Sequence, residues 1–291
     1  MIERGSKRKA KTPAQLEQRL NTFKRMFEKD DFYTYKASLE CIVFKYKVDD
    51  LLVDGYLIKP KGQNDLPLLI YNRGGNGRYG AVIFASLMSN LFPLAEKGFA
   101  IIGSQYRGSL GKEVVKGKYD EFGGKDIDDV VKLLDYIPHI QGVDGSRVGM
   151  YGSSRGGMQT LIASRRMPSI KALAVQSGAS DLLRELENRP EMENVYKIRI
   201  PNYSDNKHMA LAERSAINWA DTLKKNMPIL IIHGDQDTKV SVDNAYWLVE
   251  KLEEFKHPYK LSIYGGEKHS FNANAKTMAL SELATWFHLH L

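Results

Sequence analysis

Cysteine is almost absent from this sequence, since Cys41 is the one thiol among 291 residues. A lone cysteine cannot form an internal disulfide, which is consistent with a reducing compartment. Long apolar runs are absent as well, because no stretch approaches the roughly 20 apolar residues that a membrane span requires. The opening residues, MIERGSKRKAKT, also lack the apolar segment of a secretion signal. We therefore expect a cytoplasmic protein with no membrane association.

No broad basic surface is predicted, although the formal net charge is +7. Residues 1–12 contain five Lys or Arg against one Glu, so more than half of the excess lies in this short basic tail. In the rest of the chain cations alternate with acids, and no basic stripe interleaved with aromatic residues occurs. We therefore expect no nucleic-acid partner and interpret the tail as a solvated arm.

Metal and cofactor motifs are absent too. The sequence contains no H-E-x-x-H, paired C-x-x-C or calcium-loop spacing, so we expect no metal and no cofactor. Three acids cluster at Asp126, Asp128 and Asp129, and we attribute them to the preference for negative charge in the first turn of a helix. Residues 75–80 match G-x-G-x-x-G after an expected strand. The next strand lacks the acid that would bind a ribose, which argues against a dinucleotide site.

Short apolar runs alternate with helical stretches from Pro67 onward, which predicts parallel strands joined by crossover helices. The expected strands are 68–72, 100–104, 147–151, 172–176, 228–233 and 260–264. The expected helices are 84–97, 126–137, 156–166, 243–255 and 276–290. An antiparallel hairpin should precede them at 41–48 and 51–58. The pattern predicts an α/β fold with a mostly parallel central sheet and helices on both faces.

Three parts of the chain are expected. Residues 1–30 should form the basic tail and an amphipathic helix that begins at Thr12-Pro13, because a capping hydroxyl followed by proline is typical of a helix start. The apolar stripe of this helix should pack on its own domain, with a dimer contact, and hence a homo-oligomer, as the alternative; it comprises Leu16, Leu20, Phe23 and Phe27. Residues 38–291 should form one domain.

That domain is interrupted at 181–214 by a polar, proline-containing stretch that is too long for an ordinary loop. We interpret this insertion as a lid. It mixes apolar with cationic residues. Two roles are open: binding of an apolar substrate group with a nearby carboxylate, or simple coverage of the domain.

A nucleophile elbow is predicted at residues 152–156, where Gly-Ser-Ser-Arg-Gly fits G-x-S-x-G in one register and places Ser154 at the centre. A strand precedes this motif and a helix follows it, as in the α/β-hydrolase fold. Small residues are needed at both ends, because the strained turn brings strand and helix close together. Serine alone is a weak nucleophile, so it needs a base, an acid that orients the base, and donors for the oxyanion.

The two partners of a serine nucleophile follow it in the expected order. In the α/β-hydrolase fold an acid and then a histidine lie on loops after later strands. Asp235 and Asp237 come directly after the next-to-last expected strand, and His269 follows the last one. The other six histidines lie in connecting loops, in the final helix, in the lid or at a strand end. The sequence predicts a triad of Ser154, an acid from this pair, and His269.

Six short motifs are spread along residues 38–291: Gly74-Gly75, Tyr106-Arg107-Gly108-Ser109, GKDIDDV at 124–130, the elbow with its paired glycines, HGDQD at 233–237 and KHSF at 268–271. Together they resemble the catalytic domain of the prolyl oligopeptidase family of serine peptidases. The resemblance implies an α/β-hydrolase fold and hydrolysis through an acyl-enzyme. It also implies that Arg107 pairs with an acid and braces the oxyanion loop.

The resemblance assigns further roles to particular residues. In the family pattern the catalytic aspartate stands three residues before a valine. This pattern matches Asp237 and Val240 and gives Asp235 a structural role. By position in the same pattern, the backbone N–H donors of the oxyanion hole fall on Gly75 and Arg155.

The expected function is a serine hydrolase that cleaves a peptide, amide or ester bond through an acyl-enzyme on Ser154. Small peptides or esters are the expected substrates. A carboxylesterase or a hydrolase of an acylated small molecule is the alternative, because the same triad cleaves both bonds. A binding protein that keeps the hydrolase fold without catalysis is a further alternative, against which the complete set of serine, acid and histidine argues.

Overall fold

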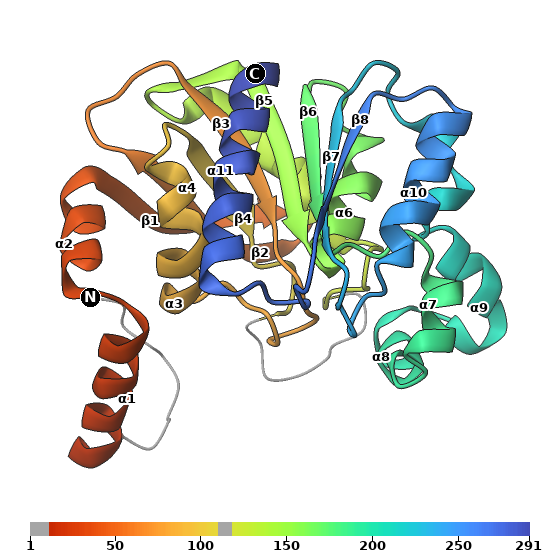
Figure 1. The fold of residues 1–291 in the computed structure, drawn as a ribbon, viewed down its shortest axis with the longest axis horizontal. Coiled ribbons are helices and arrows are strands. Elements are labelled where there is room, and N and C mark those ends of the chain that lie inside the picture. The colour runs from red at the N-terminus through yellow and green to blue at the C-terminus, as the bar shows by residue number, and fades with distance from the viewer. Residues whose placement is uncertain (1–11, 110–117) are drawn as a thin grey trace.

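The computed structural model describes residues 12–109 and 118–291, and within them eight strands form one sheet (Figure 1). The strand order is β1-β2-β4-β3-β5-β6-β7-β8. β1 pairs antiparallel with β2 and β2 with β4, whereas all other neighbours are parallel. The strands are β1 (Leu39–Val48), β2 (Leu51–Pro60), β3 (Leu66–Asn72), β4 (Ala100–Ser104), β5 (Val143–Ser153), β6 (Ala172–Gln176), β7 (Ile229–Gly234) and β8 (Tyr259–Tyr264). The predicted mostly parallel α/β sheet is confirmed.

Helices cover both faces of the sheet (Figure 1). The longer ones are α1 (Pro13–Met26), α2 (Lys29–Ser38), α6 (Arg155–Ser164), α8 (Met192–Arg199), α9 (Tyr203–Ala212), α10 (Asp243–Glu254) and α11 (Ala273–His290). The shorter ones are α3 (Phe84–Ser86), α4 (Phe92–Ala95), α5 (Asp126–Val131) and α7 (Leu182–Asn188). A π-helical turn, η1 (Leu87–Leu91), joins α3 to α4, and η2 (Lys132–His139), η3 (Ala216–Asn218) and η4 (Ala220–Thr222) are 3-10 turns.

Two hydrophobic cores lie on opposite faces of the sheet. α4 and α11 contribute to one core, while α5, α6 and α10 contribute to the other. β3 shows the principle, because Leu68 and Ile70 point into one core and Leu69 into the other, all completely buried. A strand buried on both faces is apolar throughout, which is why these strands are visible in the sequence as short apolar runs.

The N-terminal hairpin is present and longer than predicted. β1 and β2 pair from Leu39 opposite Pro60 to Val48 opposite Leu51, so each strand extends two residues further at its outer end. The tight turn is allowed because Asp49 adopts φ +52°, a region that aspartate tolerates better than most residues.

α1 is capped as predicted but packs less than predicted. The Thr12 side chain accepts a hydrogen bond from the backbone N–H of Gln15 in a capping box. Phe23 and Phe27 pack against the core beneath α4 and α11. Leu16 and Leu20, however, are 55% and 50% exposed, and α1 projects away from the sheet (Figure 1). The prediction that the whole stripe packs on its own domain is therefore wrong for its N-terminal half.

No helix within residues 12–109 and 118–291 combines the length and apolar character that a bilayer crossing requires.

Candidate active site

Ser154 sits at the sharp turn between β5 and α6 with φ +59° and ψ −129°, a backbone conformation that is strained for a non-glycine residue. Hydrogen bonds hold the turn, since Ser154 N–H donates to Gln176 O at 2.8 Å and Ser154 O accepts from Gly157 N–H at 2.9 Å. A Cβ added at Gly152 would lie 2.1 Å from Gly156 O, and one at Gly156 would lie 1.9 Å from Asn72 O. Both glycines are therefore required sterically, as the elbow pattern predicts.

Asp237 and His269 meet through a hydrogen bond, although 32 residues separate them. Asp237 follows β7 and His269 follows β8, so the neighbouring parallel strands bring both loops to the same edge of the sheet. His269 Nδ1 lies 2.7 Å from Asp237 Oδ2. Because an ionised carboxylate only accepts hydrogen bonds, Nδ1 carries the proton. Nε2 is then left as the acceptor in the neutral ring.

The Asp237 carboxylate is held in its ionised form. Its Oδ1 accepts the backbone N–H groups of Lys239 at 2.8 Å and Val240 at 3.0 Å. Burial by itself raises the pKa of this carboxyl, but hydrogen bonds from His233, His269 and Val240 outweigh burial and hold the pKa well below its ordinary value. An ionised acid beside a histidine is the arrangement that orients a general base.

Asp235 has a different partner. Its Oδ1 accepts the backbone N–H of Gly266 at 2.7 Å, and the backbone N–H of the neighbouring Gln236 donates to Glu267 O at 2.9 Å. These bonds tie the loop after β7 to the loop that carries His269. The structure brings Asp237, and not Asp235, to the histidine.

The turn after β3 lies next to the nucleophile elbow. A Cβ added at Gly74 would lie 3.1 Å from Ser154 Cβ, so the backbone of this turn passes directly beside the serine. Gly75 has φ +70°, and a Cβ there would lie 2.3 Å from Tyr79 O. The oxyanion assignment to the N–H groups of Gly75 and Arg155 stays a prediction that agrees with this placement.

The Arg155 side chain braces the same turn. Its Nη1 donates to Gly75 O at 2.8 Å and lies 3.0 Å from Asp120 Oδ1, while its Nη2 lies 2.7 Å from Asp126 Oδ2. All three side chains are buried. Coupling the residue after the nucleophile to Gly75 fixes the relative position of the two expected oxyanion donors.

A second buried cation, Arg73, stabilises the turn after β3 through hydrogen bonds. Its guanidinium donates to Gln105 O, Gly77 O and Ser109 Oγ at 2.7 to 3.2 Å. It also lies 4.6 Å from the centre of the Tyr106 ring. Burial lowers the pKa of Arg73, and its neutral acceptors replace the lost water.

The predicted role of Arg107 needs correction. Arg107 pairs with an acid as expected, through hydrogen bonds of 2.8 and 3.0 Å to Asp129 Oδ1. It also lies 3.5 Å from Asp49 in the hairpin turn. Arg107 therefore joins α5 to the hairpin, whereas Arg73 and Arg155 brace the oxyanion turn.

The helix-dipole explanation of the acids on α5 is wrong for two of the three. Asp126 and Asp129 are completely buried. Asp126 accepts hydrogen bonds from Gln159 and from the N–H groups of residues 121, 123 and 124, in addition to Arg155. The sequence held a signal for this burial, because the two acids alternate with Ile127 and Val130, which face the core.

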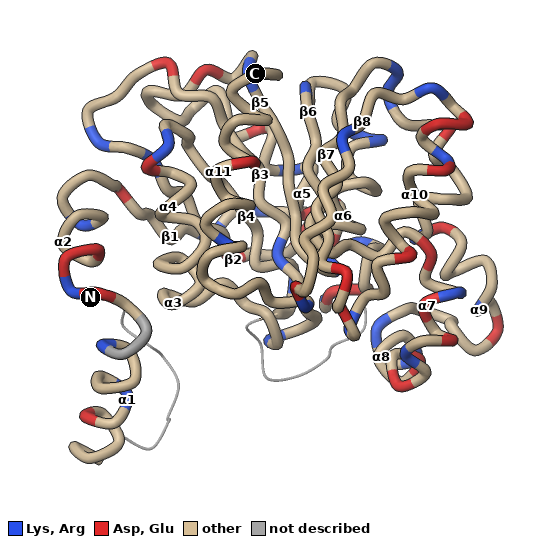
Figure 2. Tube along the Cα trace, viewed as in Figure 1, with Lys and Arg blue, Asp and Glu red and all other residues tan. Residues whose placement is uncertain are grey.

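The insertion 181–214 folds into α7, α8 and α9, which carry both signs of charge (Figure 2). Two of its cationic residues are paired, Arg184 with Asp181 at 3.3 Å and Arg189 with Glu191 at 2.9 Å. Arg199 reaches the oxyanion turn, since a Cβ added at Gly77 would lie 2.4 Å from its Nη2. Much of the segment is buried in the domain, including Leu182, Tyr196, Ile200, Tyr203 and Leu211.

No cluster of three or more His, Cys, Asp or Glu side chains that could hold a metal occurs in the described residues.

The nucleophile elbow at the end of β5, with an acid and a histidine on the loops after β7 and β8, defines an α/β-hydrolase. The comparison with known families makes this more specific. The sequence model of the prolyl oligopeptidase family matches residues 85–291. The chain therefore belongs to the prolyl oligopeptidase family, which confirms the resemblance noted from its motifs. Because the family comprises serine peptidases, membership supports an enzyme of the serine hydrolase type.

Several curated relatives are similar over most of this chain. The uncharacterized peptidase YtmA of Bacillus subtilis is 25% identical over 89% of this chain and 97% of its own length. The uncharacterized peptidase YuxL of the same organism is 27% identical over 84% of this chain, but the match spans only 38% of YuxL. The acylamino-acid-releasing enzyme 1 of Oryza sativa is 23% identical over 71% of this chain and 28% of that enzyme.

Solved structures share the fold. An acylaminoacyl peptidase in complex with Z-Gly-Gly-Phe-chloromethyl ketone superposes with a TM-score of 0.73 at 22% identity, over 90% of this chain and 43% of that one. A puromycin-hydrolyzing peptidase of Mycobacterium tuberculosis gives 0.70 at 23% identity, over 86% of this chain and 39% of that one. The chain thus spans less than half the length of these solved relatives.

Proposed function

We propose that this chain is a serine peptidase or esterase that cleaves an amide or ester bond through an acyl-enzyme on Ser154. The observation that carries the proposal is the 2.7 Å hydrogen bond between His269 Nδ1 and Asp237 Oδ2. These two residues lie on the loops that are expected to face the serine of the strained nucleophile elbow. A structural histidine has no need of a buried, ionised partner on the loop after the preceding strand.

The proposed reaction follows from these groups. Ser154 Oγ attacks the substrate carbonyl carbon while His269 Nε2 accepts the hydroxyl proton. The negative charge that develops on the carbonyl oxygen is stabilised by the N–H groups of Arg155 and Gly75. His269 then gives its proton to the leaving amine or alcohol as the bond breaks, and water hydrolyses the acyl-enzyme by the same steps in the second half.

We favour peptide and amide bonds as the bonds that this chain cleaves. YtmA, YuxL and the solved neighbours are named as peptidases, and we extend this activity to the present chain as part of the proposal. An ester hydrolase is the second choice, since the same groups cleave the more reactive bond.

A fluorophosphonate probe tests the nucleophile directly. It should label Ser154, and Ser154→Ala should abolish labelling and lower kcat by about 10⁴ to 10⁶-fold. Ser153→Ala is the matched control and should still be labelled, because the adjacent hydroxyl is not the nucleophile. Labelling at position 153, or full turnover by the Ser154 variant, would reject the proposal.

A further inference from the structure

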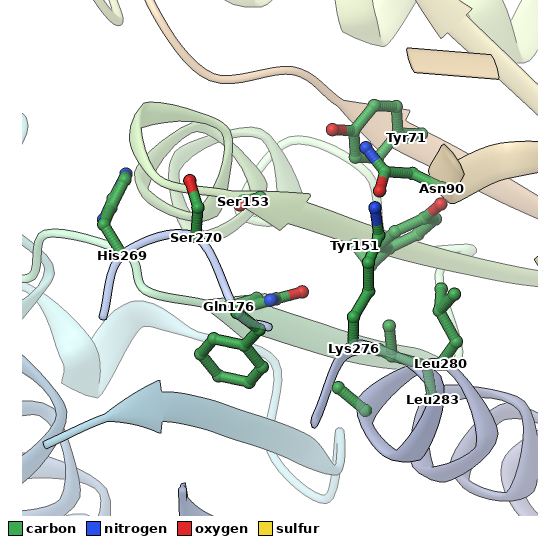
Figure 3. A pocket seen from close by; sticks show the side chains of 12 residues that line it. Tyr71, Asn90, Tyr151, Ser153, Gln176, His269, Ser270, Lys276, Leu280 and Leu283 are labelled. Carbon is green, nitrogen blue, oxygen red and sulfur yellow. The ribbon is translucent and has the colours of Figure 1, made fainter. Parts of the chain in front are cut away.

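A cavity of about 200 Å³ opens beside His269, on the face of the sheet that α11 covers (Figure 3). The two loops of the active site form one end of it, through Ser153 before the nucleophile and His269 with Ser270. The other walls come from β3, β5, β6, η1 and α11, through Tyr71, Tyr151, Gln176, Asn90 and Lys276, with an apolar side made of Phe271, Ala279, Leu280 and Leu283. No residue of the 181–214 insertion lines this cavity.

Two polar groups in this cavity have no partner within the described residues. Lys276 is half-buried, and its side-chain ammonium makes no hydrogen bond or ion pair there. The Tyr151 side chain is 5% exposed, and its buried hydroxyl has no hydrogen-bond partner. Figure 3 shows Lys276 extending from α11 toward Tyr151 and Asn90. The Lys276 ammonium is the unpaired group that a ligand in the cavity can reach, because the Tyr151 hydroxyl is closed off from solvent. A cation without a counter-ion suggests a missing anion.

The charge of the cavity defines the ligand that it fits. No acidic side chain is among its lining residues. Burial, with no anion to offset it, lowers the pKa of Lys276, while burial raises the pKa of Tyr71 to about 12 and holds that of Tyr151 well above its ordinary value. Both hydroxyls therefore remain neutral at neutral pH and add no negative charge. An ammonium without a counter-ion, in a cavity with no acid in its lining, favours a carboxylate ligand.

The location indicates which part of a substrate would carry the carboxylate. The histidine of a serine hydrolase protonates the leaving group, and His269 forms one end of the cavity, while the lid lies outside it. The apolar side of the cavity suits the hydrocarbon part of the same group.

We propose that this cavity is a subsite for an anionic leaving group, in which the Lys276 ammonium binds the carboxylate and the apolar side of α11 contacts the adjacent side chain. The substrate class is then a peptide whose free C-terminal carboxylate lies just beyond the cleaved bond. This inference rests on the proposed hydrolase activity, because a preference in cleavage can be measured only in an active enzyme. Binding of the carboxylate can be tested without turnover.

The kinetic test compares matched peptides that end in a free acid or in an amide. The wild-type protein should cleave the acid with a kcat/KM at least about tenfold higher. Lys276→Met keeps the length of the side chain, removes its charge, and should reduce kcat/KM for the acid by about tenfold while the amide is unaffected. Lys171→Met, an exposed lysine at the opposite end of the sheet, is the control and should retain the preference. Equal cleavage of acid and amide by the wild-type protein would overturn the proposal.

The binding test uses calorimetry with 3-phenylpropionate and 3-phenylpropan-1-ol, neither of which contains an amide or ester bond. The acid should bind at least about tenfold more tightly than the alcohol, and Lys276→Met should remove that difference. Tyr151→Phe is a second control: it should leave binding of the acid within about twofold of wild type and melt at or above the wild-type temperature, because it removes an unpaired buried hydroxyl that the ligand does not contact. Equal binding of the acid by wild-type and Lys276→Met protein rejects the subsite. Loss of turnover on every substrate, with binding as expected, rejects the hydrolase and retains the subsite.

Discussion

Two aspartates that are two residues apart have separate partners in this structure. Asp237 contacts the ring of His269, whereas Asp235 contacts a backbone N–H in the loop that leads to it. The order of strands and motifs narrowed the acid to this pair, and the family pattern chose between them. Spacing alone could not, because both residues follow the same strand end.

The two aspartates should therefore differ in the consequence of substitution. Asp237→Asn should leave the fold intact and lower turnover by about 10⁴-fold, because the amide no longer orients the histidine as base. Asp235→Ala should lower the free energy of unfolding by about 1 kcal/mol, the cost of one lost hydrogen bond, with a much smaller loss of turnover. Steady-state kinetics and urea unfolding of both variants measure this. Lost turnover in a stable Asp235 variant, with an active Asp237 variant, would move the catalytic acid to position 235.

The depressed pKa of Asp237 also predicts how stability depends on pH. A carboxyl group with a folded-state pKa below its unfolded value of about 3.9 stabilises the fold above that pH, and the contribution is lost as the pH falls toward the folded-state value. Unfolding free energies of wild-type protein and Asp237→Asn should therefore differ most above about pH 5. The difference should shrink by on the order of 2 kcal/mol by pH 2. A constant difference across this range would show that Asp237 is not stabilised as an anion.

At the scale of secondary structure, the sequence predicted the strands better than the helices around the site. β4 and β6 have the predicted bounds, because a strand buried on both faces is a short apolar run with clear ends. α2 was not predicted, since none of its residues is buried and its apolar pattern is weak. The helices of the insertion were not predicted either, because α7 and α8 have only seven and eight residues and α9 is kinked at Asn206.

The packing of the insertion favours the interpretation that it covers the domain. Glu185 on α7 accepts a hydrogen bond from the buried side chain of Asn244 on α10. Arg214, at the end of the segment, donates to Phe122 O at 2.9 Å. A substrate-binding role for the insertion, whose Arg199 lies beside the oxyanion turn, stays a prediction. Replacing the whole segment would therefore disturb the core, and single substitutions are the better test.

Tyr196 on α8 is the most informative position for testing whether the insertion packs as part of the domain core. Its ring is 1% exposed and packs 5.2 Å from the ring of Phe122. Tyr196→Ala should lower the free energy of unfolding by about 3 to 5 kcal/mol, the cost of removing a buried aromatic side chain. Ile198→Ala on the same helix, at a side chain that is 59% exposed, should change it by less than about 0.5 kcal/mol. A separate early unfolding transition in the wild-type protein would instead show that the insertion folds independently of the core.

Considered as a whole, the molecule places every candidate catalytic group at one edge of the sheet. Its two cores flank the sheet, and the loops after β3, β5, β7 and β8 converge where the parallel strands end (Figure 1). The apolar periodicity predicted this architecture. Periodicity did not pair Arg155 with Asp120 and Asp126, because polar residues that satisfy each other in a core have the same composition as a solvated surface. An acid partner for Arg107 was expected from the family resemblance alone.

The weak packing of α1 leads to a prediction about the whole molecule. Leu16 and Leu20 are about half exposed, whereas Phe23 lies 4.8 Å from the Phe27 ring and 5.7 Å from the Phe84 ring. The free energy of unfolding of the doubly substituted Leu16→Ser, Leu20→Ser variant should therefore lie within about 0.5 kcal/mol of the wild-type value. Phe23→Ser should lower the free energy of unfolding by more than about 1 kcal/mol, because it removes a partly buried aromatic side chain.

Thermal unfolding at several protein concentrations distinguishes this result from its alternative. If the two leucines were covered by a second copy of the chain, the wild-type Tm would rise with concentration by mass action, and the double variant would lose that dependence. The expected result is a Tm independent of concentration in both proteins. A rising wild-type Tm that the double variant abolishes would contradict the exposed state of α1 and establish it as a contact in a homo-oligomer.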